Sequence, residues 1–479
     1  MKLKSSQNRA YALDALRGIA ILAMLLSGQM PFDQNALPSW MYHAQEPPPT
    51  FDWQGNLPGI SWVDLVFPFF LFCMGAAFPL ALSRRMNQGT SRWKLGLFIL
   101  ERGFLLGFFA LFVQLIRPYT INPHPTTFVW LQALLGFLIL FPILTRLPDY
   151  WSLFVKSLVR TSGWIGVILF CWLTTYPDGS GFKLTRSDII IIVLTNMAVA
   201  GSVVWMLTRE KLLVRLGLIG VLFAVRMSNM PQATEGWVHD IWQWHPPSIR
   251  WIYQLYYLQY LCIVIPGTVA GDLILKWTRC DPAANEVKAG SKPGLMAVAG
   301  VMISLLLVLL CGLKARWLIS TTIITLVLCL IVNWMLSKPG NETAKLYANL
   351  FQWATYWLIL GLVFEPFEGG IKKDHPTLSY YFVTCGLANC MLIFFSILID
   401  VFRKKHWFGL LIDNGQNPMI AYAGINNFIT PLLALTGGAT LLTHLATTPW
   451  LGFCKGAIIT LLMALTVSLL TRKKIFWRT

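Results

Sequence analysis

Long apolar runs recur along this sequence, and they constrain its fold more than any other feature. Three of them are GLMAVAGVMISLLLVLLCGL at 294–313, WLISTTIITLVLCLIVNWML at 317–336 and LGFCKGAIITLLMALTVSLL at 451–470. A helix of about 20 apolar residues crosses the roughly 30 Å hydrocarbon core of a bilayer. Only 12% of the 479 residues are charged, about half the share of soluble domains. The sequence therefore predicts an all-α, polytopic transmembrane helical bundle.

The apolar segments also predict how many times the chain crosses the membrane. About 14 segments can be placed, at 12–32, 60–82, 94–116, 127–146, 161–176, 187–207, 211–226, 250–276, 294–313, 317–337, 346–364, 378–400, 416–436 and 451–471. Two of them, 161–176 and 211–226, are short, so we expect 12 to 14 spans. Residues 1–479 are predicted to form a single integral membrane domain.

Lysine and arginine predict the orientation of these spans. With a cytoplasmic N-terminus, about 26 of them fall on the cytoplasmic side and about 10 on the other, as the positive-inside rule requires. Both termini are therefore predicted to be cytoplasmic, in a multi-pass protein of the bacterial inner membrane. The same distribution assigns the net charge of +17 to topology and anionic lipids, not to nucleic acid. The nine cysteines form no CxxC pair, so we expect no metal site.

The outer loops differ chemically from the cytoplasmic ones. They are rich in Trp, Pro, Gly and His, as in PSWMYHAQEPPPTFDWQGNLPG (38–59) and NMPQATEGWVHDIWQWHPPSIRW (229–251). Trp and Tyr gather at any membrane interface, so part of this pattern is an aromatic belt. Aromatic, amide and histidine side chains are also what a carbohydrate-binding surface uses. On that interpretation Trp53, His124, His239 and His245 bind substrate.

Charged residues within the spans are candidate ligand contacts. Asp14 and Arg17 in ALDALRG are three residues apart, on one helix face. They form either a local ion pair or a group that faces a cavity and meets an anionic ligand, because intramembrane charges usually face the protein interior. Arg102, beside Glu101, is a second candidate of this kind.

The stretch SWVDLVFPFF at 61–70 carries an acid at the edge of an apolar run. Ser61 and Asp64 fit a capping box, S-x-x-D, that satisfies backbone N–H groups at a helix start. Pro68 is compatible with a transmembrane helix, where neighbouring groups satisfy the unpaired carbonyl. His43 precedes this stretch in a Pro-rich loop. A histidine beside a carboxylate at the mouth of a bundle is suited to general base catalysis.

Several of these motifs resemble a known family. ALDALRGIAILAML, the HA at 43–44 and PGISWVDLVFPFFLFCMGAAFPLAL resemble the transmembrane N-acetyltransferases of the heparan-alpha-glucosaminide N-acetyltransferase family. WLQALLGF, IKKDHPTLSYYFVTCGLA and NGQNPMIAYAGINNF are similar to later motifs of that family, in the same order. The similar regions cover residues 9–146 and 365–430.

The resemblance implies an acyltransferase that moves acetyl from cytoplasmic acetyl-CoA to an amino sugar or other glycan outside. It implies that His43 is the active-site histidine, as a base or an acetyl carrier, and that Asp64 orients it. Gln132 and Asn417 are expected to stabilise the oxyanion, and Asp14, Arg17 and Arg102 to complete the acetyl-CoA contacts. An insertion, EPPPTFDWQGN, separates His43 from Asp64 by 21 residues. The assignment therefore predicts that the two side chains are close despite this spacing.

Two other functions fit the composition. A transporter of a small polar or sugar-derived solute would use the intramembrane charges and Pro-interrupted helices as its substrate path. A non-catalytic glycan-binding component of an envelope complex would use only the outer surface. A homodimer is compatible with each of these functions.

Overall fold

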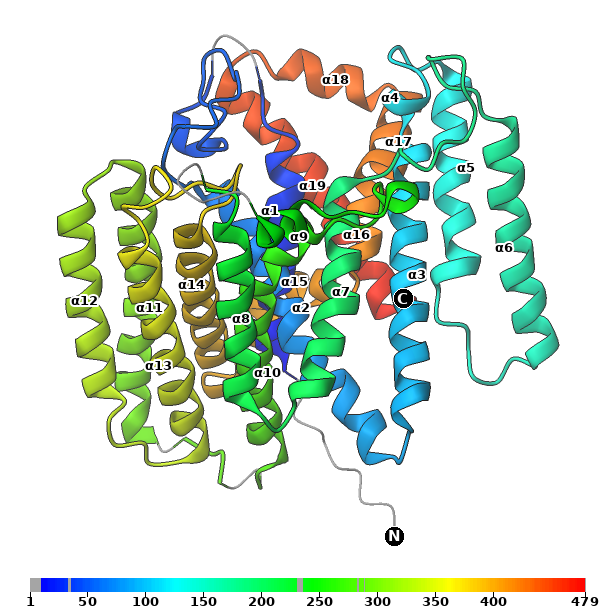
Figure 1. Ribbon diagram of the computed structural model, residues 1–479. Helices are drawn as coiled ribbons and strands as arrows, with labels where there is room; N and C mark the ends of the chain where they lie inside the picture. Colours follow the sequence, from blue (N-terminus) through cyan, green and yellow to red (C-terminus); the bar gives the residue numbers. More distant parts are fainter. Residues whose placement is uncertain (1–9, 33–35, 231–235, 282–283, 288, 479) are drawn as a thin grey trace. The chain divides into compact units, whose positions relative to one another are not determined.

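The computed structural model describes residues 10–32, 36–230, 236–281, 284–287 and 289–478. Within these ranges the chain forms helices and no strand (Figure 1), so the prediction of an all-α bundle is confirmed.

Twelve helical segments of the described chain are long and apolar enough to cross a membrane. Nine are single helices: α2 (Trp62–Asn87), α3 (Arg92–Leu115), α5 (Thr127–Leu144), α6 (Leu153–Leu173), α7 (Ile189–Thr208), α11 (Lys292–Lys314), α12 (Leu318–Met335), α13 (Glu342–Val363) and α19 (Pro449–Arg472). The other three, Leu255–Arg279, Leu378–Val401 and Pro418–Leu435, join helical pieces that include α10 (Leu261–Arg279), α14 (Leu378–Ser396), α16 (Pro418–Gly424) and α17 (Thr430–Leu435).

Two predicted spans are shorter than the rest. The segment expected at 12–32 is α1 (Tyr11–Ser27), with 17 residues, and the segment at 211–226 is α8 (Leu212–Met227), with 16. The segment at 161–176 is part of the longer α6. The structure therefore agrees with the lower end of the expected range of 12 to 14 spans.

The chain divides into two compact units. Unit 1 comprises residues 1–27, 32–89 and 262–415, and unit 2 comprises residues 28–31, 90–261 and 416–479. That the whole chain is one integral membrane domain stays a prediction.

Unit 1 is built around α14. This helix packs against α1, α2, α11 and α13, and all its residues except Phe394 are buried. Its sequence is apolar on every face, as expected of a helix enclosed by others. The short helix α15 (Gly409–Gln416) belongs to unit 1 except for its last residue.

Unit 2 pairs α3 with α7, and α5 with α6 and α17. Asp188 connects three of its segments. The Asp188 carboxylate caps the start of α7 by accepting from the backbone N–H groups of Ile190 and Ile191. It also accepts from the Arg117 guanidinium at 2.6 Å and from the Tyr422 hydroxyl at 2.7 Å. A buried carboxylate with four donors is fully compensated, so Asp188 fixes the N-terminal end of α7.

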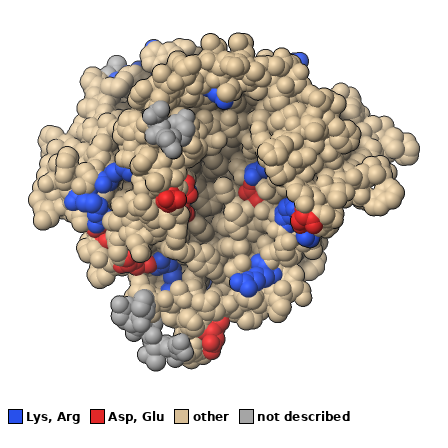
Figure 2. Space-filling model, turned by 90° about the horizontal axis from the view of Figure 1, so that it is seen from above, with Lys and Arg blue, Asp and Glu red and all other residues tan. Residues whose placement is uncertain are grey.

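Many large apolar side chains point away from the protein. On α6 and α12, Trp172, Leu173 and Leu330 are each more than two thirds exposed, at 79%, 70% and 69%. Helix faces that expose so many large apolar side chains are suited to contact with lipid and not with water. The surface seen from above carries only small, separate groups of charged side chains (Figure 2). The chain is an integral, multi-pass membrane protein.

Candidate active site

The structure brings His43 and Asp64 together in unit 1. The Nδ1 of His43 lies 2.6 Å from the Oδ1 of Asp64. Asp64 has no exposed surface, whereas 27% of the His43 side chain is exposed. The predicted pairing is therefore confirmed, with the carboxylate inside the protein and the imidazole at its surface.

The start of α2 places Asp64 there. Ser61 is the N-cap, and its hydroxyl accepts from the N–H of Val63 while Asp64 reaches back to the N–H of Ser61 at 2.8 Å. The second oxygen, Oδ2, also accepts from the N–H of Ala44 at 3.2 Å. Thus Oδ2 completes the predicted capping box and Oδ1 holds the imidazole. Both interpretations of Asp64, as a helix cap and as a partner of histidine, apply to the same side chain.

The insertion between His43 and Asp64 does not separate them, because Gln45 closes the loop. The Gln45 amide is buried and donates to the carbonyls of Leu57 at 2.9 Å and Gly59 at 3.2 Å. Its oxygen accepts from the backbone N–H of Lys373 at 3.4 Å. The inserted residues form a loop whose two ends lie together beside the site.

Lys373 is a member of this site that sequence reasoning missed. Its Nζ lies 3.1 Å from the Nε2 of His43 and 3.3 Å from Nδ1. Lys373 belongs to IKKDHPTLSYY, a motif that sequence analysis singled out without assigning it a function. Nothing in the sequence indicates that this segment folds against a loop 330 residues earlier. Tyr380 of the same motif donates its hydroxyl to the backbone carbonyl of Asp64 at 2.8 Å.

The predicted substrate-binding residues lie in both units. Trp53 belongs to unit 1, is 56% exposed, and meets the His375 ring edge-on at 5.5 Å between ring centroids. It therefore lies near the segment that carries Lys373. His124, His239 and His245 belong to unit 2, where the Nδ1 of His239 contacts the carbonyl of Ser228 at 3.1 Å. A shared carbohydrate-binding surface stays a prediction.

Two of the five predicted acetyl-CoA contacts are in unit 1. Arg17 and Asp14 approach to 3.8 Å, and Arg17 also donates to the carbonyl of Gly415 at 3.2 Å. The backbones of α1 and α15 nearly touch here. A Cβ at Gly18 would lie 1.9 Å from the carbonyl oxygen of Leu411. Arg17 thus joins two helices, which is the local, structural role that the sequence left open.

The other three are in unit 2 and interact with protein groups. Arg102 lies over the Phe98 ring, at 5.7 Å from its centroid. Gln132 donates to the Thr174 hydroxyl at 2.6 Å. The buried Asn417 donates to the carbonyl of Ile475 at 2.8 Å and accepts from the N–H of Trp477 at 3.1 Å. The two Asn417 bonds hold the C-terminal segment in place within unit 2. The oxyanion role of Gln132 and Asn417 stays a prediction.

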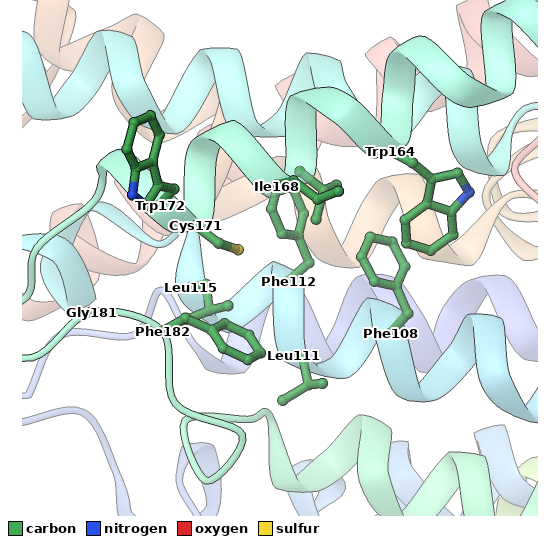
Figure 3. Close-up of a pocket in the computed structure, with 11 residues that line it drawn as sticks. Phe108, Leu111, Phe112, Leu115, Trp164, Ile168, Cys171, Trp172, Gly181 and Phe182 are labelled. Atoms are coloured by element: carbon green, nitrogen blue, oxygen red, sulfur yellow. The ribbon is translucent and has the colours of Figure 1, made fainter.

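A cavity of about 570 Å³ lies in unit 2, between α3 and α6 (Figure 3). Its wall is formed by aromatic and aliphatic side chains, and none of the predicted site residues lines it. Its lining residues are Phe108, Leu111, Phe112, Leu115, Trp164, Val167, Ile168, Cys171, Trp172, Gly181 and Phe182. This wall suits hydrocarbon and carries no acid or base for catalysis. Across the described ranges, no group of three or more His, Cys, Asp or Glu residues could hold a metal ion.

Comparison with known proteins gives one family. No curated protein matches the chain. Residues 9–274 match the model of a family described as a domain of unknown function, DUF5009. The matched region includes His43 and Asp64 but ends before Lys373, and it covers more than half of the 479 residues. The chain therefore belongs to the DUF5009 family.

Proposed function

We propose that this protein is a membrane-embedded acetyltransferase in which His43, oriented by Asp64, is the general base. The observation that carries the proposal is the 2.6 Å contact between a partly exposed imidazole and a fully buried carboxylate. A carboxylate that accepts from Nδ1–H leaves Nε2 unprotonated and turned toward substrate. Such an arrangement suits removal of a proton from an attacking amine or hydroxyl.

The donor is acetyl-CoA, and the acceptor is an amino sugar or another glycan on the outer side of the membrane. Nε2 of His43 accepts a proton from the acceptor amine as its nitrogen attacks the thioester carbonyl. The tetrahedral intermediate then expels the CoA thiolate, which takes the proton from His43. Asp64 stabilises the imidazolium that exists between these two proton transfers.

The direction of α2 supports a reaction that uses both sides of the membrane. Asp64 lies in the first turn of this helix, and Arg84 and Arg85 lie in its last turn. The 26 residues of α2 span about 39 Å at 1.5 Å per residue. On the proposed topology the basic end is cytoplasmic, where the CoA phosphates would be, and the imidazole is at the outer end.

The same placement favours a transferase over a transporter. Transporters bind their substrates near the middle of the bilayer, often at unwound helices. The His43–Asp64 pair instead lies at the end of a long, continuous helix. Transport of a polar solute remains the alternative that the test below distinguishes.

The test offers purified protein acetyl-CoA labelled in the acetyl group, with glucosamine or short glycans as acceptors. We expect label on the acceptor, and a His43→Asn variant slower by about 10²–10⁴-fold, the usual contribution of a general base. His444→Asn, a histidine in the exposed helix α18 (Gly438–Leu445), is the matched control and should retain full activity. Transfer by His43→Asn at the wild-type rate would remove the base. No transfer, combined with solute uptake into proteoliposomes, would favour the transporter.

A further inference from the structure

We propose that Lys373 is a positioning residue whose ammonium, held against the His43 ring, disfavours the imidazolium and keeps the ring ready to act as a base. This role rests on the proposed function, because it prepares His43 to act as a base. A base needs an unprotonated Nε2, and Lys373 is the charged side chain whose Nζ lies close to both ring nitrogens, at 3.1 Å from Nε2 and 3.3 Å from Nδ1.

The contacts of His43 define which ring nitrogen carries hydrogen. An ionised carboxylate only accepts hydrogen bonds, and an ammonium only donates them. Asp64, at 2.6 Å from Nδ1, therefore requires hydrogen on Nδ1. The Nζ of Lys373 lies 3.1 Å from Nε2 and 3.3 Å from Nδ1, so the ammonium lies against the ring beside both nitrogens and opposes a second ring proton. Asp64 thus selects the tautomer with Nδ1–H facing the acid, and the ammonium of Lys373 disfavours the addition of a second proton.

The fold fixes the position of Lys373. Its backbone N–H is bound by Gln45, and the carbonyl of Ile371 accepts from the N–H of Gly59 at 2.7 Å. Lys372 and Thr377 exchange hydrogen bonds, with the N–H of Lys372 donating to the Thr377 hydroxyl at 3.1 Å. The segment that carries Lys373 is thus hydrogen-bonded to the loop that carries His43. From this position the half-buried Lys373 side chain reaches the His43 ring.

The charges around His43 oppose one another. Asp64 in α2 favours the imidazolium, whereas Lys373 disfavours it by like-charge repulsion. Lys314, at the end of α11, interacts electrostatically with Asp64 and weakens its effect on the ring. Arg316 and Glu365 form an ion pair of their own. Removing Lys373 leaves Asp64 as the stronger influence and should make His43 easier to protonate.

The test measures the protonation of His43 directly. Diethyl pyrocarbonate modifies only unprotonated imidazole, and peptide mass spectrometry quantifies modified His43 at a series of pH values from about 5 to about 8, the range in which histidine titrates. In Lys373→Met we expect the half-maximal rate of modification at a pH higher by about one unit or more, the effect of a charge within ~4–6 Å. Lys373→Arg keeps the charge and should follow wild type. Lys345→Met, on α13 and paired with Glu342, is the matched control and should also follow wild type.

The outcomes separate this inference from the proposed function. Superimposable modification profiles for wild type and Lys373→Met would overturn the role of Lys373. Lys373→Gln, which keeps a polar side chain, gives the same comparison if Lys373→Met does not fold. The modification needs no acetyl-CoA, so a displaced profile in a protein that transfers no acetyl would refute the transferase and leave the role of Lys373 in place. If both proposals hold, the pH below which acetyl transfer is lost should shift by the same amount as the pH of half-maximal modification.

Discussion

Asp64 uses its two carboxylate oxygens for different purposes. Oδ2 accepts from Ser61 and Ala44 and thereby fixes the start of α2, while Oδ1 holds His43. Because one side chain does both, the position of the imidazole is fixed relative to α2 and not only by its own loop. Fully satisfied buried polar networks of this kind are rigid, which is what a positioned base requires.

Gln45 provides a residue-scale test of this network. We expect Gln45→Leu to lower the free energy of unfolding by about 1–3 kcal/mol, the cost of leaving one buried polar group without its partner. That group is the carbonyl of the buried Gly59, whereas Leu57 is exposed and Lys373 half-buried, so water can replace their bonds to Gln45. Thermal or denaturant unfolding in detergent measures the loss.

The same substitution elsewhere in unit 1 is its control. Gln352 is exposed on α13, so Gln352→Leu should change the free energy of unfolding by less than about 0.5 kcal/mol. If the two variants proved equally stable, the loop would not depend on the Gln45 amide.

At the scale of helices, α1 and α15 approach as closely as their backbones allow. Glycine is required on both sides of this contact, at Gly18 and Gly415. Small residues at such positions let membrane helices pack closely. The approach brings the Asp14–Arg17 pair against the end of α15 and gives Arg17 its carbonyl partner.

We expect Gly415→Ala to destabilise the protein by about 1–3 kcal/mol, the usual cost of overpacking. The new Cβ would lie 1.8 Å from the carbonyl oxygen of Asp14, so one of the helices would have to move. Gly300→Ala on α11 is the control, since its Cβ would meet nothing within 4 Å. A lower unfolding temperature for Gly415→Ala alone is the expected result, and equal temperatures would contradict this account of the contact.

The sequence predicted the individual helices better than the contacts between segments that are far apart in the chain. Hydropathy located the twelve segments of the described chain that are long and apolar enough to cross a membrane, and S-x-x-D located the start of α2, because both signals are local. Pro68 did not interrupt α2, which continues through it to Asn87. The His43–Asp64 pair was proposed from the chemistry of the two residues and supported by a motif resemblance. Lys373 was not, because its position depends on hydrogen bonds between segments far apart in the chain, which no local pattern encodes.

The orientation of the whole molecule is open to a direct test. The bias of Lys and Arg toward one side predicts that both termini are cytoplasmic. A green fluorescent protein fused after the C-terminus should therefore fluoresce, and alkaline phosphatase fused there should be inactive. Alkaline phosphatase inserted within 46–56, in the loop that follows His43, should be active. The reverse pattern would place His43 on the cytoplasmic side, where it could not meet an external acceptor.

The loop between His43 and Asp64, whose ends are joined by Gln45, has a consequence for engineering. Gln45 and Gly59 are joined to each other and to the segment before α14, and Phe51 between them packs on Tyr42 beside His43. The exposed side chains of this loop, at 52–54 and 56–57, can therefore be exchanged for those of another sequence while the acid and the base keep their positions.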